Sequence, residues 1–133
     1  MTLTGRCACG TTKYTLIQEP KFSYLCQCRQ CQKATGAGHA ALMMVAAEAL
    51  EVHGRVKAYS QRSDSGNVNS RHFCRVCGTP LVFESSGYPH LRFLTAGSLD
   101  DPSRFSPTQV LWHSAGQPWD LLDSSLKLND HGV

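Results

Sequence analysis

The sequence has no long hydrophobic run. Its longest apolar stretch spans residues 40–47, far short of the ~20 residues that a helix needs to cross a bilayer. Residues 1–6 contain no apolar segment of the kind found in secretory signal peptides. We therefore expect no membrane segment and a cytoplasmic location, where a reducing environment keeps cysteines as thiols.

Charge is also scarce. Charged residues make up 17% of the 133 residues, against 41% hydrophobic residues, a balance typical of a globular domain with its own core. The formal net charge is +3, and no basic stripe is present, so nucleic-acid binding is not expected. Several basic residues lie within a few positions of a cysteine instead: Arg6, Arg29, Lys33, Arg71 and Arg75. If all seven cysteines bound two Zn²⁺ ions as thiolates, the net charge would fall to zero.

No long helical period, internal repeat or linker is visible, so short strands dominate the prediction. Segments rich in β-branched and aromatic residues, bounded by Gly, Pro and Asp, predict strands over 13–17, 22–26, 40–45, 51–53, 56–61, 68–73, 81–83, 91–94 and 109–112. Residues 30–35 and 46–50 are expected to form short helical turns. The prediction is a mainly β domain of short antiparallel strands with minor helix, followed by a loose polar tail over residues 124–133.

All seven cysteines fall into three short clusters. Spacings of one or two residues bring sulfurs close enough to share a metal ion and rarely suit a disulfide between neighbours. An odd number of cysteines also excludes a disulfide framework that uses them all. The natural partition is one closed tetrahedral site with four sulfurs and one site with three sulfurs and an open position.

The first and third clusters predict the closed site. Each has a glycine directly after its second cysteine, as in a zinc knuckle. The two motifs are Cys7-Ala8-Cys9-Gly10 and Cys74-Arg75-Val76-Cys77-Gly78. Four thiolates saturate tetrahedral zinc, so this site would be structural and would join the N-terminus to the middle of the chain. The alternative is that these are free cysteines of the core.

The second cluster, Cys26-Gln27-Cys28-Arg29-Gln30-Cys31, differs because three sulfurs come from one short segment. A histidine could complete this site, although none stands at a recognisable ligand spacing; the candidates are His39, His53, His72, His90, His113 and His131. We favour water or a substrate atom as the fourth ligand. Three thiolates make zinc a weaker Lewis acid than three neutral histidines do and suit a soft substrate thiolate. Addition of a thiol to a small carbonyl compound therefore fits this site better than hydrolysis.

Several motifs together carry a resemblance to a known family. They are Gly5-Arg6-Cys7-Ala8-Cys9-Gly10, Cys26 to Gly36 with its three cysteines, Arg71-His72-Phe73-Cys74-Arg75-Val76-Cys77-Gly78, Ala96-Gly97-Ser98-Leu99-Asp100-Asp101-Pro102, Val110-Leu111-Trp112 and Pro118-Trp119. Over residues 4–123, as a single domain, the sequence resembles the glutathione-dependent formaldehyde-activating enzyme family, which also includes centromere protein V.

The resemblance implies a zinc-stapled, Mss4-like (β-tent) fold with two Zn²⁺ ions per chain. It implies structural zinc on Cys7, Cys9, Cys74 and Cys77, and an open, catalytic-type zinc on Cys26, Cys28 and Cys31. The namesake activity is that of a carbon–sulfur lyase, which handles the adduct of glutathione and formaldehyde, S-hydroxymethylglutathione. The expected partners are thus a small thiol such as glutathione and a small aldehyde.

Candidate substrate residues flank the second cluster. Arg29, Lys33 and Thr35 could meet a carboxylate of glutathione, or they could instead be solvated surface or support for the sulfurs. His39 could reach the same site, whereas Trp112 is expected in the core.

Three functions remain open at this point. The leading hypothesis is a zinc-dependent enzyme that positions a thiol and a small aldehyde. The alternative is a non-catalytic zinc-binding module for a protein or nucleic-acid partner, although the chain has no basic arm to support it. The third is a zinc carrier or redox sensor that loses its metal on oxidation.

Overall fold

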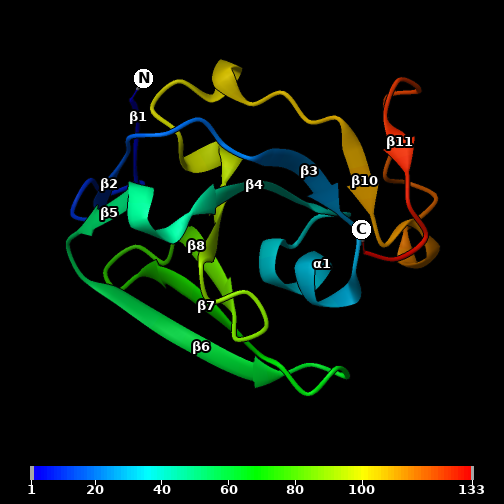
Figure 1. The fold of residues 1–133 in the computed structure, drawn as a ribbon, viewed down its shortest axis with the longest axis horizontal. Helices are drawn as coiled ribbons and strands as arrows, with labels where there is room; N and C mark the ends of the chain where they lie inside the picture. The colour runs from blue at the N-terminus through cyan, green and yellow to red at the C-terminus, as the bar shows by residue number, and fades with distance from the viewer. Residues whose placement is uncertain (1, 133) are drawn as a thin grey trace.

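The computed structural model describes residues 2–132 and shows a mainly β protein with one α-helix in that range (Figure 1). The elements in chain order are β1 (Leu3–Arg6), β2 (Lys13–Leu16), β3 (Phe22–Cys26), α1 (Arg29–Thr35), β4 (Ala40–Ala46), η1 (Ala47–Ala49), β5 (Leu50–His53), β6 (Val56–Arg62), β7 (Val68–Cys74), β8 (Pro80–Ser85), β9 (Leu91–Thr95), η2 (Ala96–Ser98), η3 (Pro102–Arg104), β10 (Gln109–Leu111), η4 (His113–Ala115) and β11 (Lys127–Leu128). The predicted fold class, short and mostly antiparallel strands with minor helix, is confirmed.

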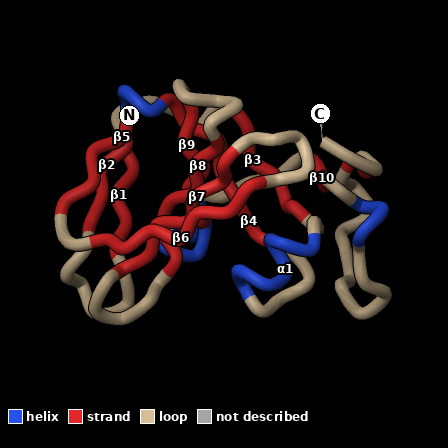
Figure 2. Tube along the Cα trace, turned by 90° about the horizontal axis from the view of Figure 1, so that it is seen from below, coloured by secondary structure: helices blue, strands red, loops and turns tan. Residues whose placement is uncertain are grey.

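The strands of residues 2–132 form two sheets. A three-stranded antiparallel sheet has the order β1-β2-β5, and an eight-stranded sheet has the order β11-β10-β3-β4-β9-β8-β7-β6. The large sheet is antiparallel except at β10, which pairs in parallel with β3 and with β11. Figure 2 shows the small sheet on one side of the molecule and α1 with β10 on the other.

Strand β4 separates two hydrophobic clusters because its side chains alternate between the two faces of the sheet. Met43 and Val45 join the first cluster, which combines both sheets and also contains Cys7, Tyr14, Leu16, Cys74, Leu81 and Leu94. Leu42 and Met44 contribute to the second cluster, together with Tyr24, Cys26, Phe83 and Leu111. Each buried aliphatic side chain contributes about 1.5–3 kcal/mol. Cys7 and Cys74 thus lie in the first hydrophobic cluster, and Cys26 lies in the second.

Two parts of the chain differ from the expectation. Strand β1, which the sequence pattern missed because Thr and Gly dilute it, pairs with β2 from Leu3 opposite Leu16 onwards. The tail, expected to be loose, instead pairs with β10 through β11, and Asn129 N–H donates to Val110 O over 2.9 Å. Without β11, the polar backbone groups on that side of β10 would have no strand partner. Val133, the last residue of the predicted tail, lies outside the described residues.

The buried phenol of Tyr14 makes stability sensitive to alkaline pH. Its ring is 1% exposed, its hydroxyl lies 2.8 Å from Ser98 Oγ, and burial raises the pKa of Tyr14 to about 12. The unfolded chain, with a tyrosine pKa of about 10, ionises first. The free energy of unfolding is therefore unaffected by this group below pH ~10 and falls by up to about 3 kcal/mol between pH ~10 and ~12.

We expect Tyr14→Phe to cost about 1 kcal/mol at pH 8, from the lost hydrogen bond, and to show a shallower loss of stability above pH 10. Urea unfolding of both proteins from pH 8 to 11 measures this difference, since other titrating groups are common to the two. Parallel stability curves across that range would contradict the assignment.

Candidate metal centres and substrate cavity

The structure brings Cys7, Cys9, Cys74 and Cys77 together. Their four sulfurs lie within 4.8 Å of one another, with 3.6 Å from Cys7 to Cys9 and 3.8 Å from Cys9 to Cys74. A tetrahedral zinc site with Zn–S bonds of about 2.3 Å has S···S edges of about 3.8 Å, whereas a disulfide would need about 2.05 Å. The spacing fits one shared metal ion.

Two similar turns build this group. In the first, Gly10 N–H donates to Cys7 O over 3.1 Å; in the second, Gly78 N–H donates to Cys74 O over 2.9 Å. Both glycines have φ near +80°, a conformation that residues with a Cβ rarely adopt. The glycine that follows each cysteine pair is therefore required by the turn that presents the two sulfurs.

Hydrogen bonds favour the thiolate form of two of these cysteines, Cys74 and Cys77. The Thr11 hydroxyl, 3.4 Å from Cys74 Sγ, and the backbone N–H of Cys77 lower the pKa of Cys74 to about 5. The Thr79 hydroxyl, 3.2 Å from Cys77 Sγ, and its backbone N–H lower the pKa of Cys77 to about 7. Because cysteine binds metals as the thiolate, Cys74 and Cys77 are prepared for a cation at neutral pH.

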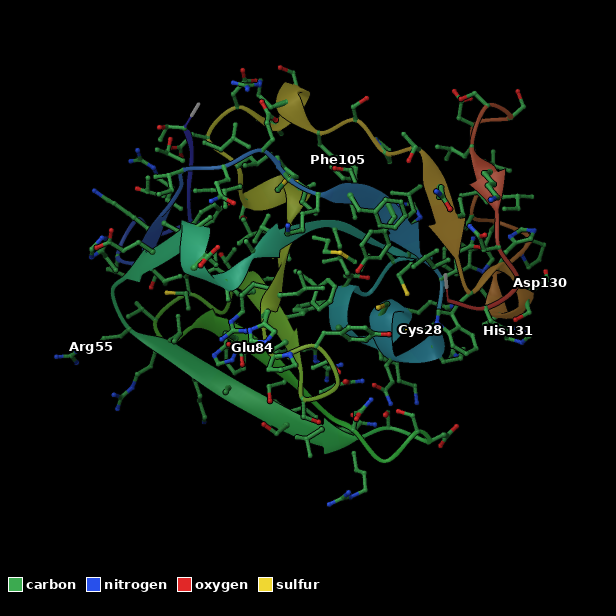
Figure 3. The ribbon with its side chains drawn as sticks, viewed as in Figure 1. Cys28, Arg55, Glu84, Phe105, Asp130 and His131 are labelled. Atoms are coloured by element: carbon green, nitrogen blue, oxygen red, sulfur yellow. The ribbon has the colours of Figure 1, made fainter. Side chains whose placement is uncertain are left out.

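The second group consists of Cys26, Cys28 and Cys31, whose sulfurs also lie within 4.8 Å of one another. Cys26 ends β3, Cys28 is the N-cap of α1, and its sulfur accepts from Cys31 N–H over 3.3 Å. Figure 3 shows Cys28 beside α1. The thiols of Cys26 and Cys31 lower the pKa of Cys28, and Cys26 and Cys28 raise that of Cys31. One negative charge is thus shared, and a cation is needed to hold all three as thiolates.

Among the described residues, no histidine nitrogen or carboxylate joins this second group within the same distance. Water or a substrate atom as the fourth ligand stays a prediction.

A hydrogen-bonded network around Gln27 supports the loop that carries the second group of cysteines. Gln27, 1% exposed, accepts from His113 Nδ1 over 2.8 Å through Oε1 and donates to Asp120 Oδ2 over 2.9 Å through Nε2. Asp120 also accepts from His39 Nδ1 at 2.8 Å. Gln32 Nε2 donates to Gln27 O over 2.7 Å. Buried polar groups that are fully paired in this way hold one conformation, so the network fixes the orientation of the cysteine loop.

The three cysteines of the second group line a cavity of about 500 Å³, a size within the range of about 300–1,000 Å³ typical of small-molecule sites. Its apolar walls come from β3, β4, β8, β9 and β10, and its polar walls come mainly from the hairpin of β6 and β7. Among residues 2–132, none of the four cysteines of the first group is part of this lining. Of the two groups, the second is the one that lines this cavity.

The three candidate substrate residues lie beside the loop rather than in the lining of this cavity. Arg29 Nη1 donates to Gln32 Oε1, and Thr35 Oγ1 donates to Cys31 O over 2.9 Å. Lys33 is exposed in the last turn of α1. Their part in substrate binding stays a prediction.

Trp112, expected in the core, is 40% exposed and lines the cavity. That expectation was wrong because β10 ends at Leu111 and the backbone of Trp112 is left-handed, with φ of 58°. The alternation of the strand therefore does not extend to this side chain. Its indole instead meets the ring of His131 edge-on, with centroids 5.0 Å apart.

Arg71 is the functional candidate that the sequence did not single out for the site. It lines the cavity, its guanidinium lies 5.2 Å from the centroid of the Tyr59 ring, and Nη1 donates to Gln30 O over 3.4 Å. The sequence marked Arg71 only as a basic neighbour of a cysteine. Its place opposite the second group depends on the register of β6, β7 and β8, which no local pattern reports.

The fold and these two groups define a class: a small, mainly β protein with one group of four cysteines and one group of three cysteines that lines a cavity. The family model described as glutathione-dependent formaldehyde-activating enzyme matches residues 2–115. The chain belongs to this family, and the resemblance noted in the sequence is confirmed.

A comparison with solved structures supports the fold. A crystal structure of a Rhodobacter sphaeroides protein, a structural genomics target, superposes with a TM-score of 0.60 at 18% identity, over 95% of this chain and 99% of that one. At this identity the likeness supports the fold alone. No curated protein matches the sequence significantly. Within residues 2–132, none of the helices has the length and apolar character needed to cross a bilayer.

Proposed function

We propose that the protein is a zinc-dependent, carbon–sulfur lyase-like enzyme that forms and breaks the adduct of a thiol and an aldehyde. The family suggests glutathione and formaldehyde, with S-hydroxymethylglutathione or a related adduct as the product. The observation that carries the proposal is that Cys26, Cys28 and Cys31 lie together on the wall of a cavity large enough for a substrate. A reducing cytoplasm, the location expected from the sequence, supplies small thiols and keeps these cysteines reduced.

The cysteine sulfurs fit zinc as the resident metal. Thiolate sets select soft or borderline cations, and a tetrahedral arrangement of sulfurs is typical of zinc. We assign one ion to the four-cysteine group, as structural zinc, and one to Cys26, Cys28 and Cys31. Bound there, the second ion would supply positive charge that favours the thiolate form of a substrate thiol and polarises a carbonyl group.

The residues of the chain would hold the reactants in position. The buried network around Gln27 fixes the cysteine loop, and the cavity holds both reactants beside it, which replaces a bimolecular encounter with a positioned one. Arg71 provides a guanidinium for a carboxylate of the thiol substrate. In the forward direction the sulfur forms a bond to the carbonyl carbon, and the thiol proton ends on the carbonyl oxygen. The reverse reaction breaks the same bond.

The decisive experiment measures the exchange between formaldehyde, glutathione and their adduct with metal-loaded wild-type protein, by exchange NMR spectroscopy. We expect the exchange to be at least about tenfold faster than in buffer, because the reactants are held together. Protein treated with a chelator and shown by mass spectrometry to lack metal serves as the control. A folded, zinc-loaded protein that accelerates no thiol–aldehyde adduct would refute the proposal and favour a non-catalytic zinc module.

A further inference from the structure

One face of the large sheet carries a continuous row of bulky side chains. Six neighbouring strands, in the order β3-β4-β9-β8-β7-β6, each contribute one residue to this row, and each residue pairs directly with the next. In that order they are Phe22, Met44, Phe93, Phe83, Arg71 and Tyr59. All except Phe22 line the cavity. Side chains directly opposite on neighbouring strands are in contact distance. The row therefore forms a floor that is apolar and aromatic over most of its length and ends at Arg71 and Tyr59.

The apolar part of this floor adjoins the cysteines. Leu111 pairs with Cys26, and Tyr24, two residues before Cys26 on the same strand, pairs with Leu42. These apolar residues are buried in one cluster with Phe83, and Cys28 packs against it. A carbon atom that bonds to sulfur at this site would therefore carry its substituent into hydrophobic surroundings.

The polar wall lies on the hairpin of β6 and β7 and has few charges. It presents neutral side chains, namely Gln61, Ser63, Asn67 and Asn69. The charged side chains in the described lining are Arg71 and Glu84, and Glu84 Oε1 already accepts from Arg92 Nε over 3.0 Å. This wall suits the amides of a peptide-like thiol and one carboxylate at Arg71.

Formaldehyde has a single carbon and no substituent, so it cannot cover the apolar part of this floor. Apolar surface that stays in contact with water contributes nothing to binding, whereas an apolar substituent placed there gains with each CH₂ removed from water. We infer that the preferred aldehyde carries an aromatic or branched alkyl group, which occupies the floor formed by Met44, Phe83 and Phe93. The polar part of the thiol then lies along the β6–β7 hairpin.

This inference rests on the proposed function and keeps its chemistry. The thiol sulfur bonds to the carbonyl carbon, the electron pair of the C=O π bond moves to oxygen, and the oxygen takes the thiol proton. The product is a hemithioacetal. No electrons are transferred to another molecule, and no further reactant is needed.

Binding of stable thioethers tests the inference without any turnover. S-benzylglutathione and S-methylglutathione differ only in the group placed on sulfur, and titration calorimetry with zinc-loaded protein gives a Kd for each. We expect S-benzylglutathione to bind at least about tenfold more tightly, as burial of a phenyl group predicts. Equal affinities would overturn the inference.

Two conservative variants localise the effect. Phe93→Leu should reduce the ratio of the two affinities by at least about threefold, because it removes part of the floor. Phe105→Leu is the matched control: Phe105 packs against the first core cluster, is absent from the lining, and lies away from Cys28 in Figure 3. It should leave the ratio unchanged. Equal reductions in both variants would overturn the assignment of the floor.

Turnover separates this inference from the proposed function. With glutathione as the thiol, adduct exchange should show a larger kcat/KM for phenylacetaldehyde than for formaldehyde, again by about tenfold. Acceleration of formaldehyde alone would overturn the inference and support the proposed function. A benzyl preference in binding with no acceleration of either aldehyde would support the inferred ligand class and refute the enzyme.

Discussion

Replacing Cys74 with serine should unfold the protein or lower its Tm by at least about 10 °C. Cys74 is fully buried, lies in the first core cluster, and belongs to the group proposed to hold structural zinc. Zinc binding to small domains contributes on the order of 10 kcal/mol to folding. A loss of only about 3 kcal/mol would shift the Tm of a chain of this size by about 10 °C.

The reason is that this group joins two turns that are far apart in the sequence, and it adds to the hydrogen bond from Ala8 N–H to Thr79 Oγ1 and to the packing of the first core cluster. Cys7 and Cys9 come from the segment between β1 and β2, whereas Cys74 ends β7 and Cys77 lies in the turn between β7 and β8. A shared ion would therefore add a link between the small sheet and the large one. Without it, two buried sulfurs and the remaining thiolates would face one another with no cation between them, which is unfavourable.

Thermal unfolding followed by circular dichroism, together with metal analysis of each purified variant, measures the effect. Val76→Ala provides a matched control in the same turn, because this side chain is 66% exposed and is not a ligand. It should shift the Tm by no more than a degree or two. A Cys74→Ser protein with the Tm and the zinc content of wild type would exclude a structural metal at this group.

Cys28→Ser should behave in the opposite way: activity should fall by at least about 100-fold while the fold is kept. The loss is expected because removal of one of three sulfurs leaves a site that binds its metal poorly. The fold should survive because Cys28 is the N-cap of α1, with its sulfur accepting from Cys31 N–H. Serine is among the best N-cap residues and can accept the same hydrogen bond.

The measurements are the adduct-exchange rate, the Tm and the metal content of the variant. We expect the loss of one zinc equivalent out of two and a Tm within a few degrees of wild type. Ser114→Ala, an exposed change on η4 outside the cavity, should retain both zinc equivalents and full activity. Full activity in a Cys28→Ser protein that has lost this zinc would show that the second group is not the reaction centre.

Most of the prediction about the metal centres, namely one group of four cysteines and one group of three, came from the cysteine spacings. Each cluster is local, so its sulfurs are neighbours in any fold that the chain adopts, and a following glycine signals the turn. Strand positions were also readable, from β-branched and aromatic runs between turn residues. The weak points were β1, diluted by Thr and Gly, and β11, whose two residues carry no strand signal and gain their partner from the free side of β10.

By itself, the sequence determined the mainly β class, the family and the division of the cysteines into local clusters, because spacing, composition and short periodicity act over a few residues. Only the tertiary structure decided what surrounds the second group. Met44, Phe93, Phe83 and Arg71 come from four separate strands and meet only through the register of their pairing. A shift of one residue in any of these pairings would turn the row to the other face of the sheet. The cavity, and with it the substrate that the site would prefer, therefore depends on long-range pairing.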